Sequence, residues 1–244
     1  MMTNLFSIFD PSTSTMTSLN WISLMIPLMI TQYNYWYLPS RMNMMWSMLN
    51  KFMFIEFKML TKKSLYINLI IFISLMKLIL IINLMGLFPY IFTPTSHLNI
   101  NLALSLSMWI SFMMYGWLMN TNKMFIHLVP MNTPTVLMNF MVMIESISNI
   151  IRPWTLAIRL TANMLAGHLL LSLLGSSMSH FLMMIPMMII IQNMLFMLEI
   201  SVAMIQSYVF SILSTLYFNE SNYDNYKSSI PYSNNKTMTN TNLN

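Results

Sequence analysis

Long stretches without a single charged side chain are the feature that most constrains this sequence. Four of them, at 11–40, 78–122, 124–144 and 160–198, match or exceed the roughly 20 apolar residues that a helix needs to cross a bilayer. Over the whole chain of 244 residues, 57% are hydrophobic and 7% are charged, against roughly 25% charged in an ordinary soluble domain. So few charges exclude a soluble globule, and so little polarity excludes a disordered chain. The sequence therefore predicts an integral membrane protein.

The rest of the composition excludes some classes of site and indicates which kind of genome encodes the chain. In a soluble protein a formal charge of +5 would suggest nucleic-acid binding, but this chain is predicted to lie in a membrane. The absence of cysteine excludes disulfides and thiolate metal sites. Methionine occurs 32 times and glycine 4 times, which is typical of A/T-rich genes such as those of many animal mitochondria. No lysine or arginine precedes Arg41, so we expect neither a transit peptide nor a basic signal sequence. We expect a mitochondrially encoded protein, with an A/T-rich bacterium as the alternative origin.

Turn signals divide the apolar sequence into five expected membrane crossings. We place them at about 16–37, 64–88, 99–119, 133–174 and 181–218. The last two are much longer than one bilayer width, so they must tilt or bend, and Pro186 is expected to kink the final one. The sequence thus predicts an all-α, polytopic membrane protein. Residues 1–220 form its single membrane domain, and 221–244 form a polar C-terminal tail that we expect to be mobile.

Residues 41–63 are expected to form a sixth helix, which lies on the membrane surface. At 100° per residue, Lys51, Lys58 and Lys62 fall on one face of it. The opposite face is apolar, with Met42, Trp46, Leu49, Met53 and Leu60. An amphipathic helix of this kind lies at the interface instead of crossing the bilayer. Its excess of basic residues places it on the inner side, so the N-terminus is expected outside and the C-terminus inside.

Ionisable and amide side chains recur at intervals of seven on the last two helices. Glu145, Arg152 and Arg159 follow this spacing on one helix. Gln192, Glu199 and Gln206 repeat it on the next. Because seven residues are nearly two helical turns, each set forms one stripe whose members lie about 10 Å apart. Two antiparallel helices with such stripes can build a wet path through a membrane.

The surroundings of Arg159 favour a functional role for this side chain. Arginine at the centre of a membrane helix costs about 2.5–3.5 kcal/mol on insertion scales, so it needs a reason to be there. Ala162 and Ala166 lie on the same face as Arg159, and small residues let another backbone approach closely. A permanently charged arginine on a face of small side chains suits an acidic partner that binds only transiently. The alternative is a static Arg–Glu pair that fixes helix packing, and for Arg152, with Glu145 as its partner, both readings stay open.

Three further polar residues lie in the apolar helices. Asn163 and His168 follow Arg159 along its helix, and histidine can relay protons near neutral pH. Hydrogen-bonded packing is the alternative for a lone membrane histidine. Lys77 lies near the middle of the second crossing, and the sequence gives it no function. No spacing in the chain is typical of a metal site, a phosphate-binding loop or a nucleophile–base pair.

Three segments resemble the a-subunit family of mitochondrial F-type ATP synthases. They are IRPWTLAIRLTANMLAGHLLLSLLG (151–175), LEISVAMIQSYVFSIL (198–213) and HLVPMNTP (127–134). The start of the chain, NLFSIFDPSTS (4–14), looks like the insect members. The resemblance covers about residues 1–220. Lys77 departs from it, because an apolar residue is expected at that position.

The resemblance implies a mechanism and a set of partners. In this family, subunit a stands beside a rotating ring of c subunits, each of which carries a carboxyl group in the membrane. Protons reach the ring through one aqueous half-channel and leave it through another. Arg159 matches the essential arginine, which favours the ionised ring carboxylate and blocks proton leakage. His168, Asn163 and Glu199 match the inlet from the intermembrane space, and Glu145 matches the outlet to the matrix.

The resemblance also assigns Gln206 to a polar position that faces the arginine and Arg152 to a supporting arginine. The expected partners are the c-ring, the other membrane-sector and peripheral-stalk subunits, protons and the lipid bilayer. The expected location is the mitochondrial inner membrane, with the N-terminus in the intermembrane space and the C-terminus in the matrix. We expect no cofactor and no bond chemistry by this chain alone. The alternative function is a proton-conducting subunit of a respiratory complex, which is disfavoured because the charges concentrate on the last two helices.

Overall fold

A computed structural model describes most of the chain. The described residues are 5–14, 17–31, 36–61, 63–119, 121–129, 134, 137–178 and 185–221. Every regular element among them is a helix. The expected all-α fold is therefore confirmed, whereas the tail after residue 221 lies outside the described residues.

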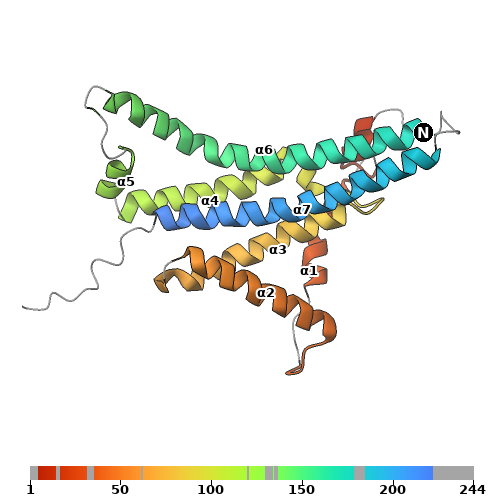
Figure 1. The fold of residues 1–244 in the computed structure, drawn as a ribbon, viewed down its shortest axis with the longest axis horizontal. Coiled ribbons are helices and arrows are strands. Elements are labelled where there is room, and N and C mark those ends of the chain that lie inside the picture. The colour runs from red at the N-terminus through yellow and green to blue at the C-terminus, as the bar shows by residue number, and fades with distance from the viewer. Residues whose placement is uncertain are drawn as a thin grey trace, which may run out of the picture.

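Four helices are long and apolar enough to cross a membrane. They are α3 (Leu69–Gly86), α4 (Leu98–Met119), α6 (Met138–Met178) and α7 (Ile185–Ser221). The apolar span of α3 begins one 3-10 turn earlier, at Tyr66. These helices correspond to the last four crossings expected from the sequence, so the multi-pass architecture is confirmed. Figure 1 shows α3, α4, α6 and α7 side by side, with the short helix α5 (Thr121–His127) linking α4 to α6.

The first expected crossing is much shorter than predicted. A 3-10 helix of seven residues, η2 (Leu19–Met25), continues into a five-residue α-helix, α1 (Ile26–Ile30). Together they rise no more than about 22 Å, which is less than the roughly 30 Å thickness of the hydrocarbon core. The helix ends at Thr31, whose backbone (φ −78°, ψ 87°) is no longer helical, and the Thr31 N–H donates the last i→i−4 bond, to the Pro27 carbonyl. The expected helix over 16–37 is thus wrong in length, and residues 32–35 lie outside the described part.

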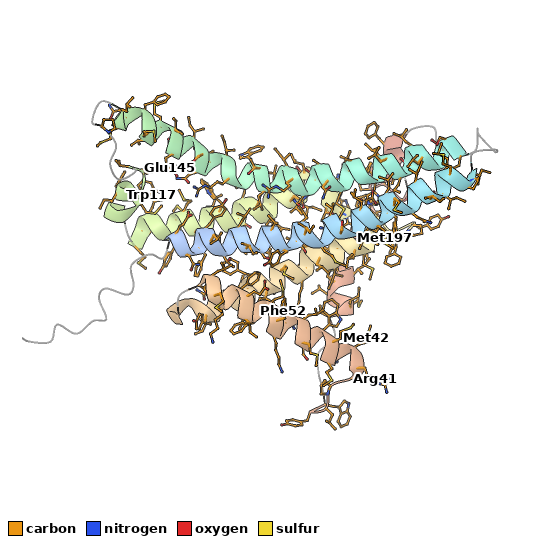
Figure 2. The ribbon with its side chains drawn as sticks, viewed as in Figure 1. Arg41, Met42, Phe52, Trp117, Glu145 and Met197 are labelled. Carbon is orange, nitrogen blue, oxygen red and sulfur yellow. The ribbon has the colours of Figure 1, made fainter. Side chains whose placement is uncertain are left out.

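The amphipathic segment forms helix α2 (Arg41–Leu60), as expected. The Ser40 hydroxyl accepts a hydrogen bond from the Asn43 N–H and caps its start. Phe57 is fully buried against α3, whereas Lys51 and Lys58 are exposed. Figure 2 shows α2 diverging from the other helices toward its labelled first residues, Arg41 and Met42.

The core lies where α3, α4, α6 and α7 meet. One cluster joins Phe57, Leu69, Phe72 and Ile73, and a second joins Ile79, Leu156, Leu160 and Phe210. Small residues on α7 face this core and are all buried: Ala203, Ser207, Ser211, Ser214 and Thr215. Each hydroxyl in this set bonds a carbonyl three residues back in its own helix, which removes the cost of burying it. Small, internally satisfied side chains therefore let α7 pack closely against its neighbours.

Helices α6 and α7 form a long curved pair (Figure 1). Their 41 and 37 residues correspond to about 62 and 56 Å, roughly twice the hydrocarbon thickness. Pro153 lies inside α6, and the half of the helix before it bends away from α7. Pro186 is the second described residue of α7, and the turn before it, where the expected kink would show, lies outside the described residues. The expected start of α6 at Thr133 lies outside the described residues, and α6 continues past Gly175 to Met178.

Candidate proton-path site

Arg159 lies on an open face of α6. Its side chain and those of Ala162 and Ala166 are all exposed. Leu156, Ala157 and Leu160 are buried on the adjoining side of the helix. Arg159 makes no hydrogen bond or ion pair with any residue that the structure describes. The structure thus holds a membrane cation on a smooth face that no described part of this chain covers.

Arg152 lies two turns before Arg159 and binds two carboxylates. Its guanidinium group is 3.5 Å from Glu145 on α6 and 3.1 Å from Glu220 on α7. The guanidinium also lies 5.3 Å from the ring centre of Tyr217. The pairing of Arg152 with Glu145, one of the two alternatives left open above, is therefore present. Figure 2 places Glu145 on the half of α6 that bends away from α7.

Glu220 was missed by the sequence analysis. The expected final helix ended at residue 218, where the composition turns polar, so Glu220 fell into the tail. In the structure α7 continues to Ser221, and its last turn carries Glu220 to Arg152. The seven-residue step from Gln206 reaches Leu213 and then Glu220, so an extended count along the same helix would have found it.

Glu199 on α7 meets α6 at Gly167, the residue before His168. A Cβ built on Gly167 would lie 2.8 Å from Cδ and 3.1 Å from Cγ of Glu199. The glycine therefore leaves the space that the glutamate side chain fills. His168, the next residue on α6, lies edge-on to Phe9 with ring centres 6.4 Å apart. The short N-terminal helix η1 (Leu5–Phe9) thus packs against α6 at this point.

Two atoms of this pair are buried without a hydrogen-bond partner among the described residues. They are Nε2 of His168 and Oε2 of Glu199. A buried polar atom without a partner costs about 1–3 kcal/mol, so native proteins usually satisfy it with water or another group. Both groups can exchange protons with water, and they lie on two adjacent long membrane helices, which suits a proton path.

The other expected site residues are distributed along the same two helices. Asn163 on α6 and Gln206 on α7 are both half-buried. Neither side chain forms a hydrogen bond that involves another described residue. The structure therefore pairs Glu145 with Arg152 and places Glu199 beside Gly167, next to His168 in the sequence. Arg159 lies between these two places along α6.

These features define a class of protein: an all-helical, multi-pass membrane protein with ionisable side chains along two adjacent long helices. Comparison with known proteins identifies the family. The family described as "ATP synthase A chain" matches residues 13–219. The chain is 56% identical over 226 residues to ATP synthase subunit a of Drosophila melanogaster, covering 91% of this chain and 100% of that relative.

Two other insect proteins have similar sequence identity to this chain and similar coverage. Identity is 53% over 223 residues to ATP synthase subunit a of Apis mellifera ligustica, covering 91% of this chain and 98% of the relative. It is 54% over 223 residues for that of Locusta migratoria, covering 90% and 99%. The chain therefore belongs to the ATP synthase subunit a family, the proton-translocating subunits in the membrane sector of F-type ATP synthase. This result favours the main functional prediction over a respiratory-complex subunit.

Proposed function

We propose that Arg159 faces the c-ring and controls the charge of the ring carboxyl groups as they pass. The observation that carries this proposal is the exposed, unpaired guanidinium on a face lined by Ala162 and Ala166. A fixed cation within a few ångströms favours the ionised form of a carboxyl group. Each arriving ring carboxyl would therefore release its proton beside Arg159 and take up another only after it has moved past. The same cation would repel protons that try to cross directly between the half-channels.

The inlet half-channel, in this proposal, runs along the contact between α6 and α7. His168, Glu199 and Asn163 line it, and Gln206 faces the arginine farther along α7. Support comes from the two unpartnered buried atoms on His168 and Glu199. These atoms need water, and water is the medium that a proton inlet requires.

The outlet half-channel would open at the other end of the same helices. Glu145 receives protons that leave the ring, and Arg152 holds this carboxylate in place. The 3.1 Å contact between Arg152 and Glu220 supports a role for a second carboxylate at this opening. Arg152 holds both carboxylates at one place, from which protons can pass to water.

We further propose that the protein lies in the mitochondrial inner membrane with its C-terminus in the matrix. The Asn219 side chain donates to the Leu60 carbonyl, with a distance of 2.8 Å. This bond fixes the end of α7 beside the end of α2, next to the exposed Lys58. The positive-inside rule places such a basic segment on the matrix side, and the outlet at Glu220 then opens to the matrix.

The absence of cysteine from the sequence permits a direct test of the ring-facing side. In the assembled complex, Ala162→Cys introduces a unique thiol beside Arg159. We expect it to form a disulfide with a cysteine placed next to the carboxyl residue of a c subunit. Ile70→Cys, on the exposed side of α3, is the matched control and should not form this disulfide. Cross-linking from position 70 but not from 162 would contradict the proposal.

A further inference from the structure

Lys77 lies in the middle of the membrane span of α3. This span covers the 21 residues Tyr66–Gly86, so Lys77 lies about 16 Å from one end and about 14 Å from the other. The four-carbon stem of a lysine covers less than half of either distance. Lysines near a helix end can extend their ammonium group to the interface, but Lys77 is too deep for that. A charge at this depth is expensive unless it is paired.

The described part of this chain provides no carboxylate for Lys77. The lysine forms no ion pair or hydrogen bond there. Phe72 packs on Phe218 and Ile79 packs near Phe210, so α3 and α7 run antiparallel with Lys77 level with about residue 212. Glu199 is thirteen residues farther along α7, or about 20 Å away.

The other described acidic residues are engaged elsewhere. Glu56 accepts a hydrogen bond from Tyr208. Glu145 and Glu220 both pair with Arg152. Asp10 accepts a hydrogen bond from the Ser12 N–H in the N-terminal segment. None of them is free to neutralise a cation in the middle of α3.

One side of α3 next to Lys77 is open. The exposed residues on this side of α3 and of the 3-10 turn before it, which we call the α3 strip, are Ile67, Ile70, Ile71, Ser74 and Leu78. Lys77 lies at the edge of this strip, between exposed Ser74 and buried Ile81. Lipid tails would cover the isoleucines and the leucine as well as another protein would, so these residues do not identify a partner. The lysine does, because lipid tails cannot pair with an ammonium group.

We propose that the α3 strip binds a transmembrane helix of another subunit, and that an aspartate or glutamate of this helix pairs with Lys77. A lipid phosphate fits less well, because phosphate groups lie at the interface, beyond the reach of this side chain. The c-ring also fits less well, because α7 contacts both α3 and α6 and lies between them (Figure 1), so α3 is remote from the face of Arg159. The inference rests on the depth of Lys77 and does not depend on the proposed proton path.

A zero-length cross-link in the intact complex tests the pairing. Dicyclohexylcarbodiimide dissolves in the membrane and activates a carboxyl group as an O-acylurea. A neighbouring lysine amine attacks this group, forming an amide and releasing dicyclohexylurea. We expect peptide mass spectrometry to find Lys77 joined to an aspartate or glutamate of a subunit other than c. Recovery of Lys77 without any amide link, or its linkage to a c subunit, would overturn the proposal.

Substitution of Lys77 provides a second test, because the complex should become less stable if the lysine is paired and should not if it is unpaired. If Lys77 pairs with a buried carboxylate, Lys77→Met leaves that carboxylate alone in the membrane, and one subunit is lost from the detergent-solubilised complex. If Lys77 has no such partner, methionine suits the membrane better, and the complex is at least as stable as before. Leu78→Met on the same strip is the matched control and should keep every subunit, and Lys77→Arg should largely restore the lost one. Full subunit retention in Lys77→Met would overturn the proposal.

Discussion

The side chain of Glu199 occupies the space that a side chain at Gly167 would need. This contact joins α6 to α7 at the point where His168 and Glu199 have buried, unpartnered polar atoms. A glycine here is required by its neighbour and not by backbone conformation, because no positive φ is found at any described glycine. The position of the Glu199 carboxyl group therefore depends on the absence of a single methyl group on the facing helix.

Replacing Gly167 with alanine should displace the Glu199 carboxyl group and slow proton uptake. Misplacing a reacting group by about 1 Å can cost up to ~10²-fold in rate, so we expect a loss of about 10-fold or more. The measurement is proton uptake by reconstituted complexes. Gly175→Ala is the control, because a Cβ there meets no atom within 4 Å, and it should add about 0.5–1 kcal/mol of helix stability. Equal uptake rates in the two variants would contradict the assigned role of Gly167.

Replacing His168 with alanine should slow proton flux without uncoupling it from ATP synthesis. An imidazole can take up and release protons in the physiological pH range, so the variant should lose flux and change the dependence of that flux on pH. The check is proton uptake measured against pH. Ser172→Ala is the control, because that hydroxyl bonds only the Leu169 carbonyl of its own helix. Identical pH profiles for the two variants would show that His168 is not on the path.

Glu145 and Glu220 should partly replace each other because they share Arg152. These side chains are one-third to one-half exposed, so each ion pair contributes at most about 1 kcal/mol to stability. We expect Glu145→Gln and Glu220→Gln each to slow ATP synthesis modestly. The double variant should lose more activity than the two single losses combined predict, because the effects of residues that share a partner are not additive. Purely additive effects in an ATP-synthesis assay would argue against a common outlet.

Replacing Tyr208 with phenylalanine should loosen α2 from α7. The Tyr208 hydroxyl donates to the Glu56 carboxylate over 2.8 Å, and losing such a bond costs about 1.5–3 kcal/mol. Hydrogen exchange of the α2 backbone amides should therefore become faster. Tyr115→Phe on α4 is the control and should leave this exchange unchanged. Unchanged exchange in α2 of the Tyr208 variant would show that the bond does not hold the helix.

The sequence predicted the long helices because hydrophobic length and proline positions are local signals. The span of α3 ends shortly before Pro89, and α2 begins at the Ser40 cap, as local rules suggest. The first crossing was overestimated because apolar composition does not show where the backbone leaves helical geometry, which happens at Thr31. Propensity also could not show that α7 continues through a polar turn to Ser221.

The candidate site was predicted in part for a similar reason. The seven-residue spacing placed Glu145, Arg152 and Arg159 on one stripe, and the structure keeps all three on α6. Contacts between helices depend on their relative register, which periodicity within one helix does not contain. The approach of Glu199 to Gly167 and of Phe9 to His168 therefore required the structure.

Proton-driven ATP synthesis by an Arg159→Ala complex tests the central claim most directly. The complex would be reconstituted in vesicles, driven by an imposed proton gradient and compared with an Arg41→Ala complex, whose arginine is exposed at the start of α2. The account predicts that Arg159→Ala abolishes synthesis while the subunits stay assembled, and that Arg41→Ala retains it. Coupled synthesis at a normal rate in the assembled Arg159→Ala complex would contradict the account.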